Sequence, residues 1–202
     1  RWSLVRALVQ FRASLRRREK KKVVYLVRHA EAIHNVEEHR VVHSALASGK
    51  SVSQANLARL IELQTNLALK DAPLSDGGRE QLLTALEGYE LLLAEARPHY
   101  APPELVLVSP LRRTLQTATR LFGNEVRLVA VELLREKRTG MMCDERSAVG
   151  ELRAEFPGVD FGEIEEWERS GEPIPEGEDN AAVRRRAARF VNDDLRQRSA
   201  MT

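Results

Sequence analysis

Two polar clusters carry side chains suited to phosphate chemistry. Residues 28–35 open with Arg28 and His29 and close with Asn35, and residues 109–118 contain Arg113. A histidine can act as a nucleophile toward phosphorus, and an arginine can hold a phosphate with two hydrogen bonds. A helix that begins within 109–118 would add free backbone N–H groups and a positive dipole end. The two clusters together predict a phosphate site.

Each cluster follows an apolar, β-branched run that is typical of a buried parallel strand. Helical patterns alternate with these runs, so the chain predicts βαβ units and one parallel sheet. Ligands of such sheets lie beyond the carboxyl ends of the strands, where both clusters fall. The predicted strands are 23–27, 104–108 and 126–131. The predicted helices are 57–67, 82–93 (after Ser75 as N-cap), 111–122, a short one at 163–169, and 183–195.

Composition fits one folded α/β domain, with 202 residues, 43% hydrophobic and 31% charged. Charge is uneven: residues 1–22 carry nine basic residues and one acid, and residues 23–202 carry a net −6. A net acidic domain argues against a nucleic-acid partner. Residues 1–22 are interpreted as a basic amphipathic helix, either an organelle transit segment or a membrane-surface helix, with a solvated extension as the alternative.

The remaining reactive residues predict neither a metal site nor a cofactor. A single cysteine, Cys143, excludes an intramolecular disulfide and favours a structural, reduced thiol in the cytoplasm, with a mitochondrion or plastid as the alternative from the basic segment. His39 and His43 have the spacing of a helical metal pair, but no Glu-x-x-His context surrounds them. We expect both on a helix surface, and His34 at the rim of the site.

The clusters match known signatures. Arg28-His29-Ala30 with Asn35 resembles the Arg-His-Gly…Asn signature of the histidine phosphatase, or phosphoglycerate mutase-like, superfamily, with Ala30 at the usual glycine. Residues 109–118 are similar to its second signature, and residues 73–81 and 134–140 to weaker ones. Residues 143–161 resemble the plant and fungal branch. The resemblance covers residues 23–198 and implies a three-layer α/β/α fold with a mostly parallel central sheet.

By this resemblance, the domain at 23–202 hydrolyses a small phosphorylated substrate without metal. His29 would form a phosphohistidine, Glu136 would supply a proton to the leaving oxygen, and the phosphate would be bound by Arg28, Asn35 and Arg113. Phosphoglycerate mutase activity is the alternative. The tryptophan that precedes the asparagine in mutases is absent here, and a long helical insert at 36–70 replaces the mutase loop, which favours hydrolysis.

One departure concerns the family's second catalytic histidine, expected in a strand after the helix at 179–198. The chain has no such Ser/Thr-His-Gly segment, and His99 lies in a proline-rich stretch before the second predicted strand. We interpret the chain as truncated at its C-terminus. The alternatives are an inactive, phosphate-binding pseudo-phosphatase and a membrane adaptor that acts through residues 1–22.

Overall fold

A parallel sheet of three strands lies at the centre of the computed structural model, which describes residues 9–11, 24–95, 102–123, 125–172 and 177–198. Its order is β3 (Leu105–Val108), β4 (Arg127–Ala130) and β5 (Val159–Asp160). Leu105 pairs with Arg127, and Leu128 pairs with Val159. The strands expected at 104–108 and 126–131, and their parallel pairing, are confirmed. The two-residue strand β5 was not predicted.

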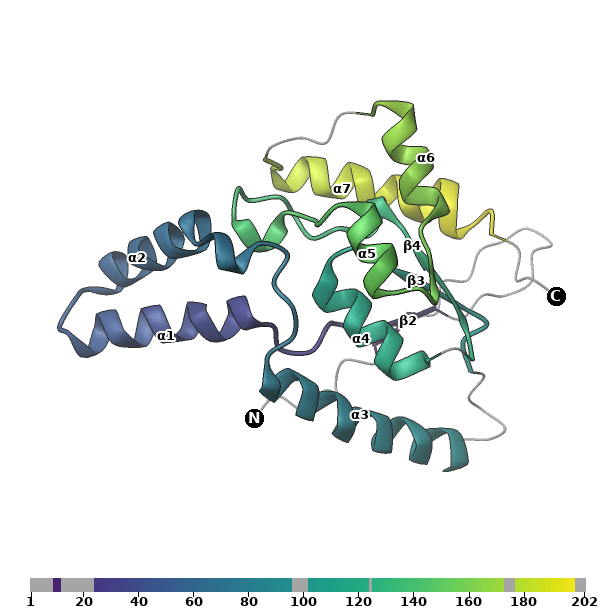
Figure 1. The fold of residues 1–202 in the computed structure, drawn as a ribbon, viewed down its shortest axis with the longest axis horizontal. Helices are drawn as coiled ribbons and strands as arrows, with labels where there is room; N and C mark the ends of the chain where they lie inside the picture. The colour runs from purple at the N-terminus through teal and green to yellow at the C-terminus, as the bar shows by residue number, and fades with distance from the viewer. Residues whose placement is uncertain (1–8, 12–23, 96–101, 124, 173–176, 199–202) are drawn as a thin grey trace.

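Helices flank this sheet in an α/β fold, as expected (Figure 1). Two of them, α3 (Asp76–Glu95) and α4 (Arg112–Phe122), lie on one side of the strands in this view. Helices α6 (Gly162–Ser170) and α7 (Asn180–Arg189), with a π-helical turn at Phe190–Leu195, lie above α3 and α4 in this view. The helices predicted at 82–93, 111–122, 163–169 and 183–195 are confirmed, and α5 (Val149–Glu155) is additional.

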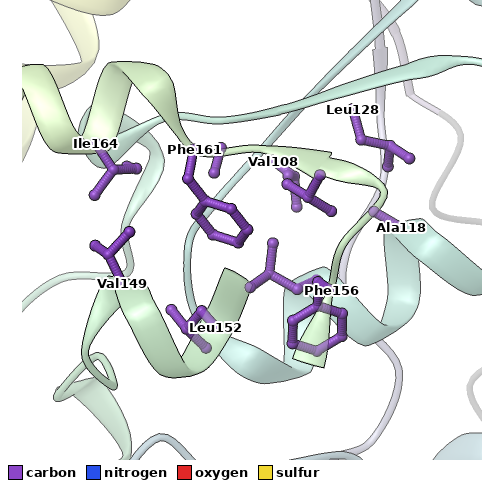
Figure 2. Packing of buried hydrophobic residues seen from close by; sticks show 11 residues of the cluster. Val108, Ala118, Leu128, Val149, Leu152, Phe156, Phe161 and Ile164 are labelled. Atoms are coloured by element: carbon purple, nitrogen blue, oxygen red, sulfur yellow. The ribbon is translucent and has the colours of Figure 1, made fainter. Parts of the chain in front are cut away.

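The main core joins the sheet to helices α4, α5 and α6 (Figure 2). Two phenylalanines on either side of β5, Phe156 and Phe161, pack with Leu152 of α5 and Leu128 of β4. Leu115 of α4 is fully buried in the same cluster. A buried leucine or phenylalanine contributes about 1.5–3 kcal/mol relative to an exposed one, so this cluster anchors the strand ends that precede the polar segments.

Helices α1 (Ile33–Ala47) and α2 (Val52–Thr65) form an antiparallel hairpin that projects from the domain (Figure 1). Ser51 caps α2 by accepting a hydrogen bond from the Gln54 N–H, and the Gln54 side chain accepts one from the Ser51 N–H in return. The insert expected at 36–70 is therefore helical, as predicted. Its fold is a pair of helices whose inner faces meet.

The predictions for the N-terminal residues, a helix at 1–22 and a buried parallel strand at 23–27, are wrong where the structure describes these residues. The run 23–27 was expected to be a buried parallel strand, but β2 (Val24–Leu26) pairs antiparallel with β1 (Val9–Phe11). Leu26 is 56% exposed and Val27 44%. Strand β1 pairs with one edge of β2, and it stands at residues 9–11 in place of part of the helix predicted for 1–22. The rest of the basic segment, 1–8 and 12–22, lies outside the described residues.

Among the described helices, none combines the length and the apolar character that crossing a bilayer requires.

Candidate active site

One pocket, of about 260 Å³, gathers all five residues that the sequence pointed to. It lies where the segments that follow β2 and β3 meet the loop that follows β4, at the base of the α1–α2 hairpin. The predicted site residues that line it are Arg28, His29, Asn35, Arg113 and Glu136. The structure therefore brings together residues that are as much as 108 positions apart in the chain.

One ring nitrogen of His29 forms a hydrogen bond, and the other has no partner among the residues that the structure describes. Its Nδ1 lies 2.7 Å from the Ala30 carbonyl oxygen, which can only accept a hydrogen bond, so Nδ1 carries the proton in the neutral ring. Burial lowers the pKa of His29, and the positive charges of Arg113 and Arg28 lower it further. At neutral pH the ring is therefore neutral, and its Nε2 has an unshared pair available for attack.

Arg113 is a buried cation in the wall of this pocket. It is 1% exposed, and its Nη1 donates to the Cys143 carbonyl oxygen at 2.7 Å. Among the described residues its Nε has no hydrogen-bond partner, and none of their carboxylates forms an ion pair with it. An unneutralised buried charge is costly, so its charge and its free donor point to an anionic ligand.

Arg28 and Asn35 complete the positive side of the pocket. Arg28 is exposed at the pocket surface. Asn35 is in the first turn of α1, where its Oδ1 accepts from the Ala32 N–H at 3.0 Å and caps the helix. Its Nδ2 faces His34, 3.0 Å from the ring Nε2. An amide nitrogen carries two hydrogens, so one remains for a ligand oxygen.

His34 was expected at the rim of the site, and this expectation is wrong: the side chain is 7% exposed. It lines the same pocket as His29, with the two ring centroids 6.3 Å apart. Burial, together with Arg113, His29 and Arg28, lowers the pKa of His34 to about 3. The signal in the sequence for this burial was the position of His34 beside Asn35 at the start of a helix, because that turn points residues 34 and 35 into the domain.

Glu136 is an exposed carboxylate on the loop after β4. That loop is held in place by hydrogen bonds from Arg186, which itself pairs with Glu178. Arg186 of α7 donates to the carbonyl oxygens of Leu133 and Arg135, at 2.9 and 2.7 Å. The same guanidinium pairs with Glu178 through two hydrogen bonds of 2.8 and 2.7 Å. Helix α7 therefore contributes to the site indirectly, by holding the backbone that leads into Glu136.

The loop that carries His29 is fixed by the start of α3. The Glu31 carbonyl oxygen accepts from the Ser75 N–H at 3.0 Å, and the Glu31 N–H donates to Gln81 at 3.0 Å. Ser75 caps α3, as predicted, by accepting from the Gly78 N–H at 2.9 Å. A Cβ on Gly78 would lie 2.0 Å from the Glu31 oxygen, so only glycine permits this approach.

A buried carboxylate, Asp71, joins three segments around the pocket. Its Oδ1 accepts from the Arg112 N–H at 2.8 Å and its Oδ2 from the Ser147 N–H at 2.9 Å. The first N–H of α4 is thus satisfied by a distant side chain, because the N-cap residue Leu111 has no acceptor. Asp71 has a φ of 45° and is fully buried. No local sequence pattern marked this residue.

The other candidate residues either do not line the pocket or lack a reactive side-chain form there. Arg112 pairs with Glu155, its Nε 2.8 Å from Oε2, as a neighbour of Arg113 that faces away from the pocket. His39 and His43 are exposed on α1, as predicted. Burial, with Asp144 beside it, raises the pKa of Cys143 to about 12. Within the described ranges, no three His, Cys, Asp or Glu side chains gather as metal ligands; His99 falls outside those ranges.

The comparisons with known proteins agree with this geometry. A family model described as the histidine phosphatase superfamily (branch 1) matches residues 24–201. Two curated proteins of Arabidopsis thaliana are similar. One, named phosphoglycerate mutase-like protein, is 31% identical over 71% of this chain and 55% of its own length. The other, phosphoglycerate mutase-like protein 1, is 27% identical over 73% of this chain and 54% of its own length.

The chain thus spans about half the length of the curated relatives it matches. No solved structure matches it at the same level of significance. The family match extends from β2 through α7 and so includes every segment that lines the pocket. On that match the chain belongs to branch 1 of the histidine phosphatase superfamily.

Proposed function

We propose that the protein hydrolyses small phosphate monoesters through a phosphohistidine at His29, without a metal ion. The observation that carries this proposal is Arg113, a fully buried guanidinium with a free Nε beside a neutral histidine. A phosphate monoester is close to dianionic at pH 7, so it supplies the charge that Arg113 lacks. Arg28 and the second Nδ2 hydrogen of Asn35 add donors for its oxygens.

The reaction then needs two displacements at phosphorus. The His29 Nε2 lone pair forms the P–N bond while the ester P–O bond breaks, and Glu136 gives a proton to the leaving oxygen. Water next attacks phosphorus, Glu136 takes its proton, and the P–N bond breaks to release phosphate. The arginines stabilise the charge on the equatorial oxygens in both steps.

A phosphoglycerate mutase activity is the second candidate, favoured by the names of the two curated relatives. Both activities use the same phosphohistidine and differ in the acceptor of the phosphoryl group, which is water or a second hydroxyl. With 3-phosphoglycerate as substrate, release of inorganic phosphate supports hydrolysis. Conversion to 2-phosphoglycerate without phosphate release would show mutase activity and contradict the proposed phosphatase activity.

Two adjacent arginines offer a matched test of the proposed site. Arg113→Met removes the buried cation, and Arg112→Met removes only a partly exposed pair with Glu155. We expect kcat/KM for p-nitrophenyl phosphate to fall about 100-fold or more in the first variant, because one preorganised charge contact is lost from the transition state. The second should stay within about twofold of wild type, since pairs near the surface contribute little.

Circular dichroism spectra should show that both variants remain folded, and EDTA should leave wild-type turnover unchanged. Equal activities of the two folded variants would contradict the role of Arg113. Loss of turnover in EDTA that is restored by a divalent cation would contradict the metal-independent reaction.

A further inference from the structure

We propose, on the basis of the proposed function, that His34 is a positioning residue: its Nε2 accepts a hydrogen bond from Asn35 and holds that amide ready for the substrate phosphate. The two side chains are adjacent in the first turn of α1, and both line the pocket that contains His29. The reaction described above assigns His34 no role of its own.

The direction of the hydrogen bond follows from the other end of the Asn35 amide. A backbone N–H can only donate, so the atom that receives the Ala32 N–H at 3.0 Å must be the Asn35 oxygen. The amide nitrogen is therefore the atom 3.0 Å from the His34 Nε2. Because that nitrogen is a donor, His34 Nε2 must be unprotonated and must accept.

The tautomer of His34 follows in turn. A neutral imidazole with an unprotonated Nε2 carries its hydrogen on Nδ1. That Nδ1 is buried and has no hydrogen-bond partner among the described residues. An unpaired buried donor is unfavourable, so the surroundings of Nδ1 do not favour the tautomer that carries hydrogen there. The bond to Asn35 is the interaction that fixes the ring.

The surroundings keep His34 in the neutral form that this role requires. Burial opposes a positive charge on the ring, and so do the charges of Arg113 and Arg28. Protonation would turn Nε2 into a donor that faces the Asn35 donor and would break the bond. A neutral acceptor thus lies next to two arginines, where an acidic side chain would compete with the phosphate for their charge.

Two substitutions of His34 distinguish the effect of its hydrogen-bond acceptor from the effect of losing the imidazole ring. The Oε1 of His34→Gln reaches the distance of the histidine Nε2 and can accept from Asn35. The shorter amide of His34→Asn ends near the level of Nδ1 and leaves Asn35 without that acceptor. Inorganic phosphate is the probe, with its affinity measured by calorimetry.

We expect the dissociation constant for phosphate to rise about tenfold in His34→Asn, the effect of one misplaced hydrogen bond to an anion, and to stay within about threefold in His34→Gln. Equal loss in both variants, or none in either, would overturn the proposal.

A spectroscopic measurement on the wild-type protein tests the same bond without activity. Two-bond proton–nitrogen correlation spectra of the His34 ring should show hydrogen on Nδ1 and none on Nε2 at pH 6–8. Hydrogen on Nε2 would overturn the inference whatever the enzyme does. Failure of wild type to bind phosphate and to form a phosphohistidine would instead contradict the proposed function, and this spectrum would still decide the His34–Asn35 bond.

Discussion

Replacement of Gly78 by alanine should damage both stability and activity, because the start of α3 touches the backbone of the loop that carries His29. The new Cβ would lie 2.0 Å from the Glu31 carbonyl oxygen and 2.9 Å from its carbonyl carbon. An ordinary carbon–oxygen contact is about 3.3 Å, so the two segments must separate by roughly 1.3 Å. The obstacle is backbone and cannot rotate away.

That separation breaks the hydrogen bonds of Glu31 with Ser75 and Gln81, both 3.0 Å long. Two lost hydrogen bonds and the strain of overpacking together cost about 2–5 kcal/mol. Displacement of the His29 loop by about 1 Å should also lower kcat/KM by about 100-fold. Urea unfolding followed by circular dichroism measures the first effect, and phosphate release from p-nitrophenyl phosphate the second.

The neighbouring glycine provides the control. A Cβ on Gly77 would meet the side-chain Oε1 of Glu31 at 3.1 Å, and this carboxylate can rotate. Alanine also favours the helix by up to about 1 kcal/mol, so Gly77→Ala should change the free energy of unfolding by less than about 1 kcal/mol and retain activity. Similar stability and activity in the two variants would refute the close approach at Gly78.

Three further predictions concern the supports of the pocket. Asp71→Asn keeps the backbone geometry but loses one of two accepted N–H bonds, so the free energy of unfolding in urea should fall by about 1–3 kcal/mol; no change would contradict the bond to Ser147. Arg186→Lys cannot bridge the carbonyls of Leu133 and Arg135 that precede Glu136, so kcat should fall about tenfold with KM nearly constant, and a change confined to KM would argue against positioning. Because the pKa of His34 is about 3 when folded and near 6.5 when unfolded, the unfolded chain binds more protons between these values, and stability falls as pH drops from 6.5. The loss between pH 7 and pH 5, measured by urea unfolding, should be smaller in His34→Gln; an equal loss would contradict a buried, neutral His34.

The parts of the fold that could be predicted are those with local signals. The β-branched runs at 104–108 and 126–131 are bounded by turns and become β3 and β4, and Ser75 precedes a strong helical pattern and caps α3. Strand β2 has an equally apolar sequence, yet its burial depends on which strands pair with it. Pairing is a long-range property, so the composition of 23–27 could not reveal an antiparallel partner at 9–11.

The residues that line the pocket could be named from the sequence, whereas the residues that support them could not. Arg113 and His29 occur in recognisable motifs, and the pocket brings them together. Asp71 acts through hydrogen bonds to segments 41 and 76 positions away, and Arg186 reaches 51 and 53 positions back along the chain. No local pattern encodes such contacts, because their value depends on where the folded chain places a free carbonyl or N–H.

The most direct test of the account is to identify the residue that becomes phosphorylated during turnover. Wild-type protein is mixed rapidly with a 32P-labelled phosphate monoester, quenched in alkali and digested, and the labelled peptide is analysed by mass spectrometry. We predict an acid-labile, alkali-stable phosphate on His29 that disappears in His29→Asn together with phosphate release. Label on another residue, or undiminished turnover in His29→Asn, would contradict catalysis through His29.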